Sequence, residues 1–253
     1  MEDLLKYSMK ISNVCSIIHI GGHVGQEVEL YKSLNFKRVI YFEPVKLFSD
    51  QISQKIKNLK NFELFQFALG SDNFESSINI ADKGEDDNSG STSLLEPRDS
   101  EITFSNTESI QIKKYSDLSI KNIDCAIIDT QGYELEVLRG FENKIDDFKF
   151  LILEFSNYEG YIGQVLYNDL NKYLNEHNFV LLKQIKKVNK VIPTNKSGSY
   201  GDALYININL ISNAKSKLLT YRYKLLNNHV VDFLNKFSKL NVYKKLIKSF
   251  FKI

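Results

Sequence analysis

The sequence predicts an α/β fold with a mostly parallel sheet and an antiparallel last strand. Two observations support this prediction. Short apolar runs alternate with segments of helical periodicity, as in βαβ units, and three glycines follow the first apolar run, where a strand would pass into a helix. The chain has 253 residues, 43% of them apolar. This length and composition are enough for one large domain with a substantial core.

The first part of the chain reads as alternating strands and helices. In the first expected helix, Val28, Tyr31 and Leu34 recur at helical spacing. Pro44 closes the second expected strand, and the turn GSDN closes the third. We expect strands at residues 15–20, 38–44 and 62–69, and helices at residues 26–34 and 47–59.

The middle of the chain departs from this alternation. Residues 71–112 contain short alternating segments around the polar stretch DKGEDDNSGSTS, which predicts short strands and a Ser/Gly/Asp-rich loop. Order and disorder are both open for that loop. Regular α/β structure then resumes, with Gly140 expected as a helix stop signal and the last two strands as a hairpin-like antiparallel edge. We expect strands at 124–129, 148–155, 179–185 and 203–211, and helices at 134–141 and 164–177.

The net charge of +2 conceals an acidic body and a basic tail. Residues 214–253 hold ten Lys and Arg and one acid, Asp232, so this segment carries +9 and the rest of the chain carries −7. From Val230 onward, apolar residues follow helical spacing with lysines between them, which predicts a basic amphipathic helix. We therefore expect an α/β domain at residues 1–212 and a helical extension at 213–253. The extension is expected to dock on the acidic body, to form a dimer, or to contact an anionic membrane surface.

Cysteine usage and the N-terminus favour a cytoplasmic protein. Cys15 and Cys125 fall in or beside apolar runs, which predicts free core thiols rather than a secreted disulfide framework. The first residues lack the basic and apolar regions of a signal peptide. No segment approaches about 18 uninterrupted apolar residues, the length of a membrane span. The basic tail adds the inner face of the membrane as an expected location.

The acids that follow the apolar runs indicate which cofactor the glycine turn receives. Ligands of open α/β sheets bind at the carboxyl ends of strands, where Glu43, Asp129 and Glu154 are expected. Glu43 follows Gly21 by 22 residues, which is the spacing of an acid that holds a ribose diol. Glu27, in the first turn of a helix, suits the helix dipole but disfavours a phosphate there. S-adenosylmethionine has no phosphate and carries two cationic groups, so this pocket favours it over NAD.

Seven segments of the chain occur in the order of a known family's motifs: HIGGHVGQE, VIYFEP, FALGSDN, SGSTSLLE, CAIIDTQGYELEVLRG, LILEFS and GDALYIN. Over about residues 15–210 the chain resembles the FkbM family of methyltransferases, most specifically at residues 129–140, which read D-x-x-G-x-E-x-x-x-L-x-G. The resemblance implies a class I S-adenosylmethionine-dependent methyltransferase fold at 1–212. The family's usual activity is O-methylation of hydroxyls on sugars or natural products.

The resemblance also implies cofactor contacts at matching positions. Glu43 would hold the ribose, Ala68 and its neighbours would flank the adenine, and Asp129 would lie beside the methionine portion or the methyl-transfer centre. The chain departs from many members where His19 replaces Asp and His23 replaces Asn, so His19 cannot supply the usual carboxylate to the cofactor ammonium. The expected cofactor-binding residues are His19, Gly21, Gly22, Gly25, Glu27, Glu43, Ala68 and Asp129.

Methyl transfer to an alcohol requires aligned oxygen, carbon and sulfur atoms, and a general base or a metal ion helps a weakly acidic hydroxyl to react. The candidate bases are Asp129, His23, Glu154 and Glu134, of which Asp129 and Glu154 are expected to converge on one mouth. Helix capping is the alternative role for Glu134, and hydrogen bonding that shapes the loop is the alternative for His23. No compact metal motif is visible, so a divalent metal ion beside Asp129 is an open alternative.

The predicted function is O-methylation of a sugar hydroxyl in a bacterial surface polysaccharide or its nucleotide-linked precursor. Tyr158 and Tyr161 are expected either to stack on the sugar ring or to be ordinary loop residues. A nucleic-acid methyltransferase using the basic tail is an alternative, disfavoured because the centre reads DTQGYE, without an N-P-P-Y-like stretch, and because no RNA-binding module is recognised. An NAD-dependent enzyme is disfavoured by Glu27 and the missing G-x-G-x-x-G, and a non-catalytic module of the same fold is a further alternative.

Overall fold

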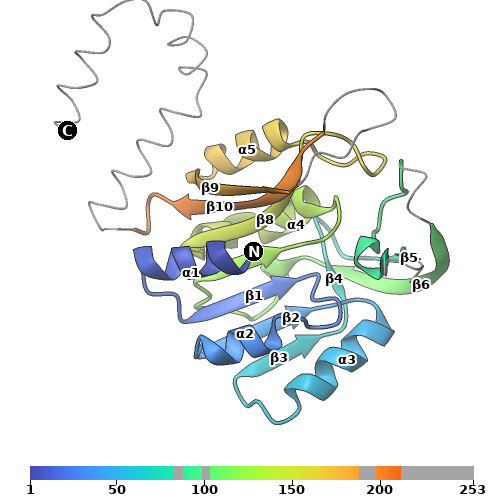
Figure 1. The fold of residues 1–253 in the computed structure, drawn as a ribbon, viewed down its shortest axis with the longest axis horizontal. Coiled ribbons are helices and arrows are strands. Elements are labelled where there is room, and N and C mark those ends of the chain that lie inside the picture. The colour runs from blue at the N-terminus through green and yellow to red at the C-terminus, as the bar shows by residue number, and fades with distance from the viewer. Residues whose placement is uncertain (82–87, 99–102, 188–197, 212–253) are drawn as a thin grey trace, which may run out of the picture.

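A twisted seven-stranded sheet forms the centre of the protein, with helices on both faces and a three-stranded sheet beside it (Figure 1). The computed structural model describes residues 1–81, 88–98, 103–187 and 198–211. The large sheet has the order β3-β2-β1-β7-β8-β10-β9, in which β10 alone is antiparallel to its neighbours. The predicted α/β fold with an antiparallel last strand is therefore confirmed.

The helices and strands follow the predicted periodicities closely. The large sheet contains β1 (Ser16–Ile20), β2 (Arg38–Phe42), β3 (Phe62–Phe65), β7 (Cys125–Ile128), β8 (Phe150–Ser156), β9 (Phe179–Lys187) and β10 (Tyr200–Asn207). The helices are α1 (Glu2–Ile11), α2 (Val28–Ser33), α3 (Lys46–Ile56), α4 (Glu134–Phe141) and α5 (Tyr167–Glu176). The sequence pattern did not predict α1.

Both faces of the large sheet are buried, which explains why its inner strands are almost continuously apolar. Along β1, Ile17 points to the face covered by α1 and α2, and Ile18 points to the face covered by α4 and α5. The residues of β7 alternate in the same way, with Ile127 on the first face and Ile128 on the second. Burial on two faces holds the strand ends in place, and the loops of the carboxyl edge start from these ends.

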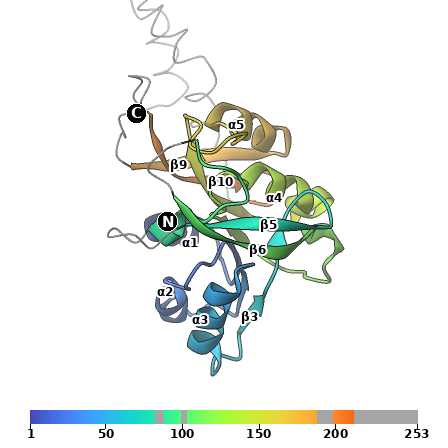
Figure 2. The ribbon, with the colours of Figure 1, turned by 90° about the vertical axis from the view of Figure 1, so that its right-hand side faces the viewer.

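The expected strand at 62–69 is divided in the structure. Residues Phe62–Phe65 form β3 of the large sheet, whereas β4 (Ala68–Leu69) pairs with β6 (Phe104–Lys113) of the small sheet. β5 (Phe74–Ala81) completes the small sheet by pairing antiparallel with β6, which confirms the predicted short strands. Figure 2 faces this small sheet, with α2 and α3 below it and α4 and α5 above it.

Gly140 has a different role from the predicted stop signal. The helix α4 continues through Gly140 to Phe141, and the chain leaves it at Glu142, whose φ is 47°. A Cβ atom on Gly140 would lie 1.8 Å from the carbonyl oxygen of Gly70. Glycine is therefore required because α4 contacts the backbone that follows β4.

Several predictions fall on parts of the chain that the structure does not describe. The basic helical extension and the domain boundary at 212 lie outside the described residues, as does most of the acidic part of the polar loop, residues 82–87. Cys15 and Cys125 are both free thiols, the first partly exposed and the second buried. No helix of the described residues has the length and apolar character needed to cross a membrane.

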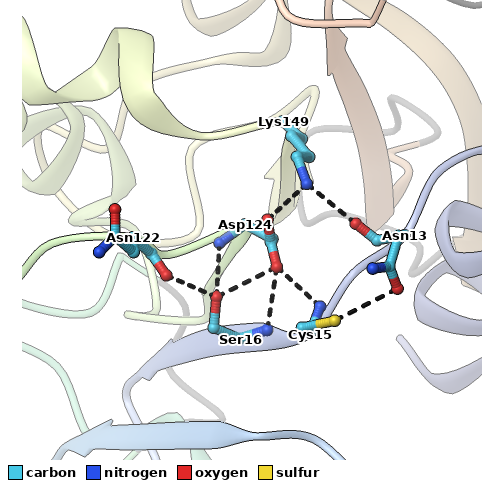
Figure 3. Close-up of polar contacts among 6 residues, drawn as sticks. All are labelled: Asn13, Cys15, Ser16, Asn122, Asp124 and Lys149. Carbon is cyan, nitrogen blue, oxygen red and sulfur yellow. Dashed lines mark hydrogen bonds and ion pairs between the residues drawn. The ribbon is translucent and has the colours of Figure 1, made fainter.

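A polar network ties three strands together at the amino edge of the large sheet (Figure 3). The Asp124 carboxylate accepts hydrogen bonds from the backbone N–H groups of Cys15 and Ser16 at 2.7 and 3.1 Å, and pairs with Lys149 Nζ at 2.6 Å. The Ser16 hydroxyl also donates to the Asn122 carbonyl at 2.7 Å. These contacts join the beginnings of β1, β7 and β8.

Replacing Asp124 with Ala should lower the free energy of unfolding by about 2 kcal/mol at neutral pH, the scale of hydrogen bonds to a charged group. Burial alone would raise the pKa of Asp124, but the hydrogen bonds from Lys149 and from the Cys15 N–H outweigh it and lower that pKa. The stabilisation is therefore present above the unfolded pKa of about 4 and is lost as pH falls through the lowered folded value.

Urea unfolding of the wild type and the variant measures this difference in the free energy of unfolding. The measurements run from about pH 2 to about pH 7, a range that covers the titration of a carboxyl group. The matched control is Asp50→Ala, which removes an exposed ion pair with Lys46 and should change stability by less than about 0.5 kcal/mol. Curves for wild type and Asp124→Ala that stay equally far apart at acid pH would contradict the role given to the Asp124 charge.

Candidate functional site

A cavity of about 230 Å³ opens at the carboxyl edge of the large sheet. Its walls come from the loops that follow β1, β2 and β7, from β4 and β5 of the small sheet, and from the segment 88–98. Most of the predicted acids and glycines meet here, whereas Gly25, Glu134 and Glu154 are absent from the lining. The lining residues that concern us are His19, Gly21, Gly22, His23, Glu27, Glu43, Phe48, Ala68, Leu69, Ile78, Asp129 and Gln131.

The glycine turn after β1 is tight because two loops of the protein meet there. Gly21 has a φ of 83°, and a Cβ atom on it would lie 1.8 Å from the backbone oxygen of Asp129. On Gly22, a Cβ atom would lie 2.7 Å from the Tyr41 ring. Gly25 also has a positive φ, 66°, and donates its N–H to the Gly22 carbonyl. Gly21 therefore brings the β1 loop against the β7 loop, and Gly22 brings it against the Tyr41 ring of β2.

Glu43 lies in the cavity wall with only 4% of its surface exposed. Its carboxylate accepts hydrogen bonds from the backbone N–H groups of His23 at 2.7 Å and Val45 at 2.9 Å. Burial raises the pKa of Glu43 to about 8, although the two hydrogen bonds act in the opposite direction. This placement agrees with the predicted position of a ribose acid after the second strand.

His23 lies beside Glu43 on the β2 side of the cavity. Its ring packs edge-on against Phe48, with ring centroids 4.4 Å apart, and its φ is 44°. The contact between its N–H and Glu43 shapes the loop, which is the alternative role predicted for this residue. Its imidazole lines the same cavity as Asp129, so His23 stays the second candidate base.

His19 and Glu27 form a small polar cluster at the end of the cavity nearest α2. The His19 ring is almost fully buried and lies between Tyr31 and Tyr41, with centroids 5.9 and 5.4 Å away. Its Nδ1 is 3.0 Å from the Tyr31 hydroxyl and 3.9 Å from a Glu27 carboxylate oxygen. Glu27 is the N-cap residue of α2, and its side chain faces His19 instead of capping the helix.

Asp129 and Glu154 are joined by a residue that the sequence analysis did not select. The Gln131 side-chain amide donates to Asp129 Oδ1 at 2.7 Å and to Glu154 Oε2 at 3.1 Å. The predicted convergence of the two acids is therefore observed. Asp129 lines the cavity, whereas Glu154 reaches it through Gln131. In the sequence, the signal that could have indicated Gln131 was its position as a polar residue inside the D-x-x-G motif, between Asp129 and Gly132.

Glu134 supports the loop that carries Asp129. Its carboxylate accepts hydrogen bonds from the Thr130 N–H, the Thr130 hydroxyl and the Gly132 N–H, all between 3.1 and 3.2 Å. Burial raises its pKa to about 7 against those backbone hydrogen bonds. The side chain is 3% exposed and is absent from the cavity lining. These hydrogen bonds support the loop before α4 rather than cap the helix, and Glu134 does not face the cavity as a base would.

The tyrosines expected near the acceptor have different environments. Tyr161 is 6% exposed, and its hydroxyl donates to the Ser91 carbonyl at 3.0 Å and to Gln131 Oε1 at 3.3 Å. It is therefore buried beside Gln131, absent from the cavity lining, and offers no open stacking surface. Tyr158 lies in the loop after β8 and is partly exposed. Within the described ranges, no three His, Cys, Asp or Glu side chains group as metal ligands, so the metal alternative gains no ligand set from them.

Comparison with solved structures finds several methyltransferases, all distant in sequence. The FkbM methyltransferase of Methylobacillus flagellatus KT has a TM-score of 0.49 and 13% identity, over 76% of this chain and 43% of that protein, so the present chain spans less than half of its length. The N-methyltransferase NodS of Bradyrhizobium japonicum WM9 has a TM-score of 0.48 and 10% identity, over 81% of this chain and 84% of that one. The magnesium protoporphyrin IX methyltransferase ChlM of Synechocystis PCC 6803 has a TM-score of 0.46 and 12% identity, over 80% and 75%.

Comparison with families gives a direct assignment. No curated protein matches the chain. Residues 19–181 match the model of the methyltransferase FkbM domain, which is more than half of the 253 residues and contains the glycine turn, Glu43, Asp129 and Glu154. The chain therefore belongs to the FkbM methyltransferase family.

Proposed function

We propose that the protein transfers the methyl group of S-adenosylmethionine to a hydroxyl of a sugar, in a bacterial surface polysaccharide or its nucleotide-linked precursor. One observation carries the proposal: a carboxylate, Asp129, faces the cavity that the glycine turn and Glu43 also line. The family's usual activity, O-methylation of sugars or natural products, supports the choice of a hydroxyl acceptor.

The residues of the cavity fit S-adenosylmethionine. The acidic side chains of the cavity are Glu27, Glu43 and Asp129, and its lining holds no Lys or Arg among the residues that the structure describes. This acidic lining favours a sulfonium and an ammonium group and disfavours a phosphate. Glu43 is placed to accept ribose hydroxyls, and the apolar side chains of Phe48, Ala68, Leu69 and Ile78 offer a surface for adenine.

When bound, S-adenosylmethionine supplies the methyl group as an electrophile on its sulfonium. The Asp129 carboxylate would take the proton of the acceptor hydroxyl as that oxygen accepts the methyl group, and the C–S electron pair would remain on sulfur. The loops after β1 and β7 hold the two reactants close together, which lowers the entropic barrier. His23 is the alternative proton acceptor on the other side of the cavity.

Incubating the full chain with radiolabelled S-adenosylmethionine and a panel of acceptors tests this function. The panel contains nucleotide sugars, oligosaccharides and tRNA. We expect label in one or more sugars. Label in tRNA alone would replace the proposal by the nucleic-acid alternative, and label in none, with the cofactor bound, would favour a non-catalytic module.

S-adenosylhomocysteine should raise the melting temperature of the protein, and NAD should not. A ligand that binds only the native state adds about 2.7 kcal/mol of stability at 100 times its Kd. The measurement is a thermal shift titration with both ligands over the same concentration range. Stabilisation by NAD and none by S-adenosylhomocysteine would overturn the cofactor assignment.

Binding of S-adenosylhomocysteine should release a proton near neutral pH, through Glu43. In the free protein, burial raises the pKa of Glu43 to about 8. Ribose hydroxyls donate to the charged carboxylate and so lower this pKa in the complex. Affinity should therefore rise with pH up to about 8 and then level off.

Calorimetry in two buffers of different ionisation enthalpy measures the released proton. The variant Glu43→Gln should bind more weakly, by about 1.5–3 kcal/mol, and should lose the proton release. Glu29→Gln, an exposed acid at the start of α2, is the control and should behave as the wild type. Equal proton release by wild type and Glu43→Gln would exclude Glu43 as the ribose acid.

The variant Asp129→Asn should lose methyl transfer by a factor of about 10²–10⁴, the usual contribution of a general base, and should keep its melting temperature. Initial rates with the sugar identified in the panel, measured with and without divalent cations, separate the possible roles. Loss confined to kcat indicates proton transfer, and rescue by a divalent ion indicates a ligand role. Near-normal rates would move the assignment to His23 or Glu154.

A further inference from the structure

We infer that Gln131 is a positioning residue of the methyl-transfer site: its amide holds one oxygen of the Asp129 carboxylate and ties it to Glu154. The catalytic consequence of this arrangement rests on the function proposed above for Asp129. The hydrogen bond from Gln131 to Asp129 does not depend on that function.

The first argument is the bridge between two like charges. Asp129 follows β7 and Glu154 lies near the end of β8, the neighbouring parallel strand, so their carboxylates are brought to the same edge. Gln131 Nε2 donates one hydrogen bond to each, at 2.7 and 3.1 Å. Two carboxylates that share a site disfavour each other's charge, whereas a neutral donor to both favours the charged forms. The amide thus keeps Asp129 ready to accept a proton.

The second argument is the backbone conformation. Gln131 has a φ of 53°, in the left-handed region that is costly for residues other than glycine. Its carbonyl accepts the Ser93 hydroxyl at 2.7 Å, and the next residue, Gly132, has a φ of 102°. The loop therefore holds Gln131 in a strained conformation that directs its side chain between the two acids.

The third argument is the orientation of the amide group. The single proton of the Tyr161 hydroxyl is shared between the Ser91 carbonyl at 3.0 Å and Gln131 Oε1 at 3.3 Å, and the Gln131 amide nitrogen faces the carboxylates. Burial raises the pKa of Tyr161, against the effect of its hydrogen bond to Ser91, and keeps its hydroxyl a donor. Glu134 on α4 and Tyr31 on α2 also interact electrostatically with Asp129.

Two substitutions test the inference without an acceptor. Gln131→Leu removes the donor, and Gln131→Glu replaces it by a third carboxylate of the same size. The control is Gln164→Glu in the loop before α5, because Gln164 Oε1 accepts the N–H groups of Gly160 and Tyr161, and a carboxylate keeps both bonds. Each protein is made with ¹³C-carboxyl-labelled Asp, and Asp129→Asn identifies the Asp129 resonance.

We expect Asp129 to titrate roughly one pH unit or more higher in both Gln131 variants than in the wild type and in Gln164→Glu. Affinity for S-adenosylhomocysteine should stay within roughly threefold of wild type, which corresponds to a change of less than about 1 kcal/mol in binding free energy. Once the methylated sugar is identified, the pH at half-maximal rate of the Gln131 variants should rise by the same amount. Loss of a residue that only supports the fold would not cause this shift.

An unchanged Asp129 titration in both variants overturns the inference. This holds even if the variants lose cofactor binding, because Gln131 would then only support the fold. Where the Gln131 variants do not fold, Tyr161→Phe serves instead: it removes the hydroxyl that orients the amide, and an unchanged titration there overturns the inference as well. A shifted titration in a protein that methylates no sugar supports the hold on Asp129 and refutes the proposed function, so the two failures are distinguishable.

Discussion

The contact between Gly21 and the backbone of Asp129 is the constraint on which the site depends. The chain after β1 can pass the chain after β7 only because Gly21 has no Cβ atom, which would lie 1.8 Å from the Asp129 oxygen. Gly21 N–H donates to the Phe42 carbonyl and Asp129 N–H donates to the Ile20 carbonyl, so the ends of β2, β1 and β7 are joined in one row. This row places Glu43 and Asp129 in the same cavity, although 86 positions separate them in the sequence.

Four acids of the carboxyl edge accept hydrogen bonds from neutral donors. Glu43 and Glu134 accept backbone N–H groups, and Asp129 and Glu154 share the Gln131 amide. A neutral donor satisfies a carboxylate without cancelling its charge, so the cavity favours a cation. Burial raises the pKa values of Glu43 and Glu134 to about 8 and about 7. A cationic ligand therefore enters a site that can give up protons in response.

The amino edge of the same sheet handles a buried acid in the opposite way. There Asp124 pairs with the Lys149 cation at 2.6 Å while also accepting two backbone N–H groups (Figure 3). Its charge is cancelled locally, and the contacts join β1, β7 and β8 rather than facing a cavity. One edge therefore uses an acid to hold the strands together, and the other keeps its acids for a ligand.

The sequence by itself determined most of the local structure and the family, because these depend on short-range patterns. Apolar periodicity predicts the strands and most helices, the glycine turn and Glu43 follow from spacing, and residues 129–140 carry the family motif. The tertiary structure decided what depends on contacts between distant segments. The run 62–69 is divided because β4 pairs with β6, some 40 positions later, and Gly140 is required by its contact with Gly70. Gln131 gained its place between Asp129 and Glu154 only when β7 and β8 became neighbours, because hydrogen bonds between separate strands leave no periodic trace in the sequence.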